Sequence, residues 1–244
     1  MHERRERTFG LEAALAVLRA RPDDVRRIAY HADLGPRLGP LLGEAAARHV
    51  AYAEKPEAEL RAIAGSEHHE GLVVEARARE ILDDEGVLRV FGADRGPLRL
   101  VVLDGVENPH NVGAIVRTAA FLGAHGVIVR GRHEALFGPA AIRVAEGGAE
   151  HLALARSLEL PRLLRALAAR GVALVGTEAS APVDARTFVY PRRTAIVLGS
   201  EAAGASAEVR AALTQVVAVP GTGHVESLNV SVAAGVVLAA ALRP

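Results

Sequence analysis

The chain of 244 residues contains no cysteine and no tryptophan, and only 3% of its residues are aromatic. Without cysteine there is no disulfide, no catalytic thiol and no thiolate zinc site, and a reducing compartment is favoured. Three Tyr and five Phe are too few to build an aromatic platform on which bases stack. The sequence also lacks the G-x-G-x-x-G fingerprint, which counts against a dinucleotide-binding fold.

Long apolar runs are scarce as well. The opening residues, MHERRERTFG, are polar, and the apolar stretch near the C-terminus is shorter than the roughly 20 residues that a membrane-spanning helix needs. The adjacent histidines His68 and His69 would point to opposite faces of a strand, which disfavours a shared metal ion. We therefore expect a cytoplasmic protein without a membrane partner and without a bound metal.

Charge is balanced, because 29 basic and 29 acidic residues give a formal net charge of zero. Overall neutrality argues against indiscriminate coating of nucleic acid, and it leaves room for a local basic face. All basic residues except Lys55 are arginine, a side chain whose planar fork suits contact with phosphate. Half of the residues are hydrophobic, so a chain of this length can bury a substantial core.

Apolar periodicity predicts a small α/β unit in residues 1–76. Helices are expected at 9–20, 38–49 and 56–64, and strands at 25–30, 50–53 and 71–76. From 77 to 97 the pattern weakens while acidic residues, Gly and Pro accumulate. We expect this stretch to be a linker.

Residues 98–244 alternate more regularly. Strands are expected at 98–103, 126–129, 151–155, 172–175, 194–198 and 216–219, and helices at about 112–122, 139–145, 159–170, 206–213 and 228–242. Strands separated by helices predict a parallel sheet covered on both faces. Ligands of such sheets bind beyond the carboxyl ends of the strands.

Three loops at those ends combine polar residues with glycine. In the first, DGVENPHNVGAIVRTA, we expect Asn111 to cap a helix that begins near Val112, with Arg117 further along it. A helix N-terminus attracts anions, and a nearby arginine strengthens the attraction. A capped helix that merely carries a surface arginine explains the same residues.

The second loop, LGSEAAGAS, follows the strand expected at 194–198. Gly199 and Gly204 permit tight turns, and Glu201 would project at the end of the strand. There its carboxylate can accept hydrogen bonds from a hydroxyl or an amine. A solvated glutamate in an ordinary glycine-rich loop is the plain alternative.

The third loop lies in VVAVPGTGHVESLNVSVAAGVVLAAAL, where the chain breaks at Pro220 and passes a glycine-rich turn. We expect a helix near Ser227 with that serine as its N-cap. The helix is almost entirely Ala, Val and Gly, so it should be buried on most sides. A ligand site and a plain strand–loop–helix unit both fit this loop alone. Three such loops in one sheet favour a composite site.

Three segments carry a family resemblance: NPHNVGAIVRTA, IVLGSEAAGAS and VPGTGHVESLNVSVAAGVVL. In order and spacing they resemble the motifs of the SpoU (TrmH) family, S-adenosylmethionine-dependent RNA ribose 2′-O-methyltransferases of the SPOUT superfamily. The resemblance implies that residues 98–244 form an α/β methyltransferase domain with a deep trefoil knot, and that the protein is a homodimer with active sites at the interface. Residues 1–76, through Phe9-Gly10 and His69-Glu70-Gly71, resemble the L30e-like substrate-binding domain of ribosomal-RNA members.

The resemblance also implies roles for individual residues. The catalytic positions of the motifs are matched by Asn111, Arg117, Glu201, Ser227 and Asn229. Cofactor contacts, largely through the backbone, fall on Thr177, Gly199, Val219, Gly221 and Leu228. Two residues depart from the family pattern: Gly221 stands where Met is usual, which would enlarge the cofactor pocket, and Ala202 stands where Gly is common, which would stiffen the loop.

The implied reaction is methyl transfer from S-adenosylmethionine to a ribose 2′-hydroxyl of structured RNA. The expected substrate is a guanosine of 23S ribosomal RNA, with transfer RNA second and no DNA. A guanidinium stays protonated up to about pH 12, so Arg117 is expected to bind a phosphate and stabilise negative charge rather than act as a base. The other four catalytic positions would orient the ribose, its hydroxyl and the helix cap. The alternatives are an inactive RNA-binding paralogue and a dinucleotide-dependent enzyme.

Overall fold

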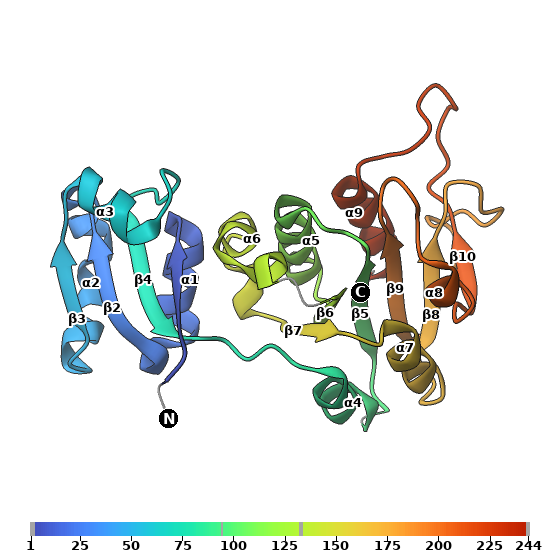
Figure 1. The fold of residues 1–244 in the computed structure, drawn as a ribbon, viewed down its shortest axis with the longest axis horizontal. Helices are drawn as coiled ribbons and strands as arrows, with labels where there is room; N and C mark the ends of the chain where they lie inside the picture. Colours follow the sequence, from blue (N-terminus) through green and yellow to red (C-terminus); the bar gives the residue numbers. More distant parts are fainter. Residues whose placement is uncertain (1–2, 94, 132–133, 243–244) are drawn as a thin grey trace.

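The computed structural model describes residues 3–93, 95–131 and 134–242, which form two β-sheets with a helical segment between them in the chain (Figure 1). None of the helices in these ranges has the length and apolar character needed to cross a membrane. Short 3₁₀ turns occur at Pro22–Asp24, Ala32–Leu34, Glu134–Phe137 and Gly148–Glu150.

The N-terminal unit is a four-stranded sheet in the order β1-β4-β2-β3. Its strands are β1 (Arg5–Phe9), β2 (Val25–Tyr30), β3 (Ala51–Glu54) and β4 (Leu72–Arg77). The helices α1 (Leu11–Ala20) and α2 (Gly35–Ala47) pack on one face, over Leu72 and Val74. The helix α3 (Glu57–Ala64) covers the other face, where Leu60 meets Val73. The alternation of buried side chains along β4 therefore gives this small sheet two separate cores.

The strand β1 is absent from the elements predicted for this unit. Its sequence, RERTF, alternates charge with little apolar content, and it lies at an edge of the sheet, antiparallel to β4. Only Thr8 and Phe9 are buried. The prediction that Phe9 begins a helix is wrong, because Gly10, at φ +90°, ends the strand and α1 begins at Leu11. Glycine adopts this left-handed region without the steric cost of a side chain.

The C-terminal unit is a six-stranded sheet in the order β10-β8-β9-β5-β6-β7. The strands are β5 (Leu98–Asp104), β6 (Gly126–Arg130), β7 (Ala153–Ser157), β8 (Ala173–Thr177), β9 (Arg193–Gly199) and β10 (Gln215–Val217). Every neighbouring pair is parallel. The predicted α/β architecture with a parallel sheet is confirmed.

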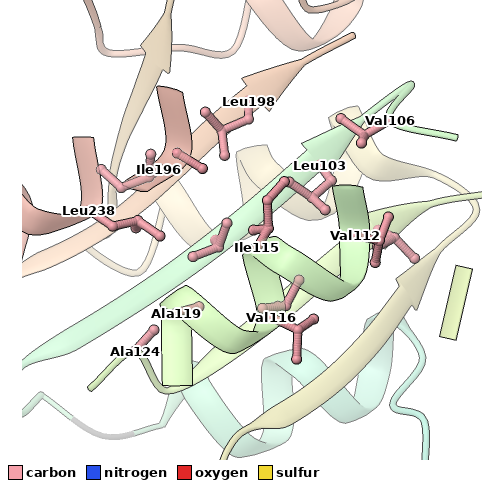
Figure 2. Close-up of a cluster of buried hydrophobic side chains, with 14 of the residues drawn as sticks. Leu103, Val106, Val112, Ile115, Val116, Ala119, Ala124, Ile196, Leu198 and Leu238 are labelled. Carbon is pink, nitrogen blue, oxygen red and sulfur yellow. The ribbon is translucent and has the colours of Figure 1, made fainter. Parts of the chain in front are cut away.

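Helices cover both faces of this sheet. The helices α5 (Pro109–Phe121), α6 (Pro139–Val144) and α9 (Val230–Ala241) share one core with Val101 and Leu103. The helices α7 (Leu160–Ala168) and α8 (Ala207–Arg210) share the other with Leu100 and Val102. In Figure 2, Ile115 of α5 lies beside Leu103 of β5 in the first of these cores. The continuous apolar run of β5 is thus explained by burial on both faces.

The helix α9 is less enclosed than its composition predicted. Val230, Ala234 and Val237 are buried, whereas Val232 is 52% exposed. Its main neighbours in the single chain, α5 and β9, lie on the sheet side. The face that carries Val232 stays open to solvent.

The stretch expected to be a linker contains a further helix, α4 (Asp84–Gly92). Asp83 caps it by accepting a hydrogen bond from the Gly86 amide at 2.8 Å. Leu82, Val87 and Phe91 are buried in the same core as α7. The acidic start of the segment obscured this helix, yet acidic residues are favourable in a first helical turn because they face the positive end of the helix dipole.

Buried ion pairs join the two units. Glu150, whose side chain is 3% exposed, lies 2.7 Å from Arg21 and 3.0 Å from Arg79, nearest nitrogen to oxygen. Glu6 pairs with the same two arginines, at 2.7 and 2.9 Å. Glu150 belongs to the C-terminal unit and Arg21 to the N-terminal one. The Glu150–Arg21 pair, with side chains 3% and 18% exposed, therefore links the two units.

Candidate functional site

Several strands of the C-terminal sheet end at one edge. The strand order places β10, β8 and β9 side by side, with β5 next to β9, and parallel strands share the edge at which they end. The loops after β5, β9 and β10 leave from this edge, and the last of them is the long loop that precedes α9 in Figure 1. In open parallel sheets this edge is where ligands bind.

A hydrogen-bonded cluster joins these three loops. Oε1 of Glu201 accepts hydrogen bonds from Asn111 Nδ2 at 3.1 Å, Asn229 Nδ2 at 2.8 Å and the Val230 amide at 3.2 Å. Asn229 Nδ2 also donates to Asn111 Oδ1 at 3.2 Å. A carboxylate accepts several such bonds better than a neutral group, and it lies here at the positive end of α9. The cluster is open to solvent, so a ligand can reach it.

Asn111 does not cap α5, contrary to the prediction. The helix begins at Pro109, and Asn108 is the N-cap, with its side chain accepting from the His110 amide at 2.9 Å. Proline at the first helical position is pre-organised for the helix, which moves the start three residues upstream. The amide of Asn111 is thereby free to contact Glu201.

Ser227 is not a helix cap either. The helix α9 begins at Val230, and Asn229 caps it by accepting from the Ser231 amide at 2.9 Å and from Ser231 Oγ at 2.6 Å. Asparagine is as effective an N-cap as serine. Ser227 lies exposed in the preceding loop, and none of the hydrogen bonds described for the Glu201 cluster involves it.

The residues expected to contact the cofactor lie along the same edge. Thr177 ends β8, Gly199 ends β9, and Val219 follows β10. Thr177 Oγ1 is 3.5 Å from the carbonyl oxygen of Val197 on the neighbouring strand. Gly221 and Leu228 are exposed in the loop before α9, where Leu228 keeps 46% of its surface in solvent.

This edge suits a nucleoside with a polar tail. Within the described part of the chain, residues 219–228 make no hydrogen bond between backbone groups, so most of their amides and carbonyls are available to a ligand. The His224 amide instead donates to Thr222 Oγ1 at 3.5 Å. An apolar side chain such as Leu228 beside them suits the face of an adenine ring. Gly221 has nothing within 4 Å of the place where a Cβ would stand, which leaves room there. The residues present therefore fit S-adenosylmethionine.

Arg117 lies apart from the Glu201 cluster. Six positions separate it from Asn111, which corresponds to about 9 Å along the helix and a rotation to a different face. Its Nη2 is 2.8 Å from Glu146 Oε2. It lines a cleft between the two units together with Gly10 and Arg143. Within one chain, the two polar residues of the first motif, Asn111 and Arg117, therefore lie in separate sites.

A second polar cluster at this edge escaped the sequence analysis. Asp104, at the end of β5, is 2% exposed and contacts Arg130 Nη1 at 3.0 Å. It also accepts a hydrogen bond from the Ser206 amide at 2.7 Å, while Arg130 donates to Ser206 Oγ at 2.9 Å. An Asp that ends an apolar strand was the available signal. Its contacts tie the end of the loop after β9 to β5 and β6.

Within the ranges that the structure describes, no three His, Asp or Glu side chains lie close enough together to hold a metal ion.

Comparison with known proteins gives two family matches. A model of the SpoU rRNA Methylase family matches residues 99–239, and a model of RNA 2′-O ribose methyltransferase substrate binding matches residues 8–82. A 23S rRNA (guanosine-2′-O-)-methyltransferase, RlmB, from Burkholderia sp is 36% identical over 235 residues, which cover 96% of this chain and 94% of that protein. An uncharacterized tRNA/rRNA methyltransferase from Mycolicibacterium smegmatis is 34% identical over 239 residues, covering 98% and 76%.

Solved structures agree with these matches. An AdoMet-bound rRNA methyltransferase from Sinorhizobium meliloti is similar at a TM-score of 0.79 and 26% identity, covering 98% of this chain and 87% of that one. The SpoU methyltransferase AviRb from Streptomyces viridochromogenes, solved in complex with AdoMet, has a TM-score of 0.79 at 24% identity, covering 98% and 89%, and supports the fold. The family predicted from the three motifs is thereby confirmed, and the chain belongs to the SpoU rRNA methylase family.

Proposed function

We propose that the protein transfers a methyl group from S-adenosylmethionine to a ribose 2′-hydroxyl of structured RNA. A guanosine of 23S ribosomal RNA is the first candidate and transfer RNA the second, because the Burkholderia relative is named for the former. The observation that carries the proposal is the junction of Asn111, Glu201 and Asn229 beside the loops that fit the cofactor. Cofactor contacts are assigned to Thr177, Gly199, Val219, Gly221 and Leu228.

The reaction asks little covalent chemistry of the protein. S-adenosylmethionine, when bound, would supply the methyl group, and the ribose hydroxyl that receives it would release its proton to solvent. Asn111 and Asn229 orient the ribose, and Glu201 holds both amides in place. Ser227, exposed in the loop before α9, is assigned to contact the ribose. Positioning of this kind supplies most of the rate enhancement.

Arg117 is assigned to the phosphate next to the target ribose, where its charge also stabilises the oxygen anion that develops in the transition state. Because Arg117 faces away from the Glu201 cluster of its own chain, we assign it to the site of a partner subunit in a homodimer. Each site then combines the cluster of one protomer with the arginine of the other.

An apolar surface supports the homodimer. Phe121, at the end of α5, is 88% exposed, and Val232 on the neighbouring α9 is 52% exposed. The residues of α9 carry no charge. Exposed apolar patches on soluble proteins mark surfaces that contact another protein. A second copy, docked through α5 and α9, would bury it and bring two sets of catalytic residues together.

The remaining assignments concern architecture. We assign residues 1–76 to an L30e-like unit that selects RNA, 77–97 to the connection, and 98–244 to the methyltransferase unit. We also infer that α9 passes through a loop of the chain as a deep trefoil knot. The small residues Ala234 and Gly235 support this, since a Cβ on Gly235 would already be in van der Waals contact with Thr118 of α5, at 4.0 Å, and small side chains let the two helices pack closely. A cytoplasmic location follows from the RNA substrate.

Transfer of tritium from labelled S-adenosylmethionine to total RNA tests the function. The proposed enzyme labels ribosomal RNA, and nuclease digestion recovers the label as 2′-O-methylguanosine. Binding of RNA and S-adenosylhomocysteine without transfer would indicate the inactive paralogue instead. Binding of NADH in place of S-adenosylhomocysteine would indicate the dinucleotide enzyme and refute the proposal.

A further inference from the structure

Glu146 contacts Arg117 at a cleft of about 250 Å³ between the two units. The N-terminal unit contributes Glu12 and Glu70 to its walls, and the C-terminal unit contributes Arg143. The side chains of Arg117 and Glu146 are 56% and 43% exposed. An ion pair so exposed adds little to stability. The Arg117–Glu146 contact is therefore better explained as a means of orienting Arg117 than as a means of stabilising the fold.

The backbone of Glu146 is strained. Its φ of +42° lies in the left-handed region, which only glycine enters without a steric cost from its side chain. Gly147, the next residue, has φ +87°, so the chain turns sharply here. Strained residues other than glycine concentrate at functional sites, where the surrounding structure compensates for the strain. A glutamate at this position therefore points to a use for its side chain.

The segment 146–150 lies between Arg117 and the N-terminal unit. A Cβ on Gly147 would stand 2.6 Å from Ala16 of α1, so the backbone passes very close to that helix. Glu150, at the other end of the segment, pairs with Arg21 at 2.7 Å. The docked N-terminal unit therefore fixes the backbone that presents Glu146 to Arg117.

We propose that Glu146 is a positioning residue for Arg117. Its carboxylate holds the guanidinium through Nη2, and the other N–H donors of the fork stay available for an RNA phosphate. The inference rests on the proposed function, in which Arg117 grips that phosphate. The segment that carries Glu146 packs on α1, so the position of the N-terminal unit would also influence the orientation of Arg117.

The variant Glu146→Gly tests this role without disturbing the fold, because glycine suits the positive φ. We expect an unchanged or higher melting temperature and unchanged affinity for S-adenosylhomocysteine. The single-turnover rate of methylation at saturating RNA should fall on the order of tenfold, since a loosened group acts less often in the right geometry. Glu146→Gln keeps an oxygen at the same reach and should lose less. In an Arg117→Ala background, Glu146→Gly should cause no further loss.

Glu12→Gln is the matched control, because Glu12 lines the same cleft but pairs with Arg37 at 2.7 Å. It should methylate at the wild-type rate. An equal loss in Glu12→Gln, an equal loss in the Arg117→Ala background, or a faster Glu146→Gly enzyme would overturn the proposal. Relaxation of the Arg117 Nε–H signal by NMR needs no activity and should show a more mobile side chain in Glu146→Gly. Equal mobility refutes the positioning role, whereas absence of methylation by the wild type refutes only the proposed function.

Discussion

Asn229 Nδ2 lies 2.8 Å from Glu201 Oε1, which ties the cap of the last helix to the loop after β9. The same oxygen accepts from Asn111 and from the Val230 amide. The Glu201 carboxylate thus connects the starts of α5 and α9 to the loop after β9. Its removal should therefore lower both the stability of the fold and the rate of methylation.

We expect Glu201→Ala to lower the free energy of unfolding by about 1 kcal/mol, because three donors lose a charged acceptor that is partly replaced by water. Methylation should fall much further than stability. Urea denaturation and single-turnover methylation measure the two effects, with Glu201→Gln as the variant that keeps an acceptor oxygen. Normal methylation by Glu201→Ala would show that the cluster does not serve the reaction.

Two glycines at the cofactor edge should respond differently to alanine. A Cβ on Gly199 would stand 2.0 Å from the carbonyl carbon of Gly204, whereas a Cβ on Gly221 would meet nothing within 4 Å. Gly199→Ala should therefore lower the melting temperature and abolish binding of S-adenosylhomocysteine, since backbone cannot move aside cheaply. Gly221→Ala should change stability by less than about 0.5 kcal/mol yet weaken binding.

Calorimetry with S-adenosylhomocysteine, at one site per chain, measures these affinities, and NADH and ATP serve as ligands that should not bind. Unchanged affinity in Gly221→Ala would place the cofactor away from this turn.

The buried charges between the units should make the protein sensitive at Glu150. Glu150→Gln removes the carboxylate that pairs with Arg21 and with Arg79, whose side chain is 8% exposed. It should lower the free energy of unfolding by about 3 kcal/mol, because buried positive charge is left without its partner. Glu3→Gln, which breaks an exposed pair with Arg26, should change stability little. Denaturation curves compare the two variants. Similar losses of stability would mean that the buried cluster contributes no more than an exposed ion pair.

Acid should weaken the same cluster. Burial raises the pKa of Glu6, but its pairs with Arg79 and Arg21 outweigh burial, and the net pKa lies below the ordinary value of 4.5. A carboxyl whose pKa is lower in the folded than in the unfolded state stabilises the protein at pH values above the unfolded-state pKa. That stabilisation is lost as the pH falls through the folded-state pKa. Denaturation between pH 7 and 3 should show this loss in the wild type and a smaller one in Glu6→Gln.

Removal of the N-terminal unit should separate RNA choice from cofactor binding. The cut belongs after Arg79, because Leu82, Val87 and Phe91 are part of the C-terminal core. We expect residues 80–244 to fold and to bind S-adenosylhomocysteine but to methylate their RNA poorly. Methylation at the full-length rate would contradict the division of labour between the units.

Arg117→Lys distinguishes a phosphate contact from proton transfer. Lysine keeps the charge but loses the planar fork, so partial activity is expected, with a larger loss in Arg117→Ala and unchanged cofactor affinity in both. If residue 117 acted as the base, the lysine enzyme would gain activity toward its unperturbed pKa of about 10.4. Single-turnover rates across a pH series show which holds. Parallel profiles for wild type and Arg117→Lys support the phosphate contact.

Local pattern in the sequence determined the family, the parallel sheet and the position of most elements. Strand-end glycines, the order of the three motifs and the apolar run of β5 depend only on neighbouring residues. The start of α5 was misplaced because Asn108 and Asn111 are equally good caps by type, and only the helix conformation of Pro109 separates them.

Tertiary structure decided what the motifs do with their side chains. Glu201 and Asn229 meet across 28 positions because parallel strands bring their ends to one edge, and no local signal carries that distance. Arg117 contacts Glu146 instead, whose φ is +42° and whose neighbour Gly147 packs closely against α1. The edge strand β1 and the helix α4 likewise formed against weak local patterns, because burial of Phe9 and of Phe91 on neighbouring elements outweighed them. Hydrophobic burial and backbone sterics act between segments far apart in the chain, so only the folded protein expresses them.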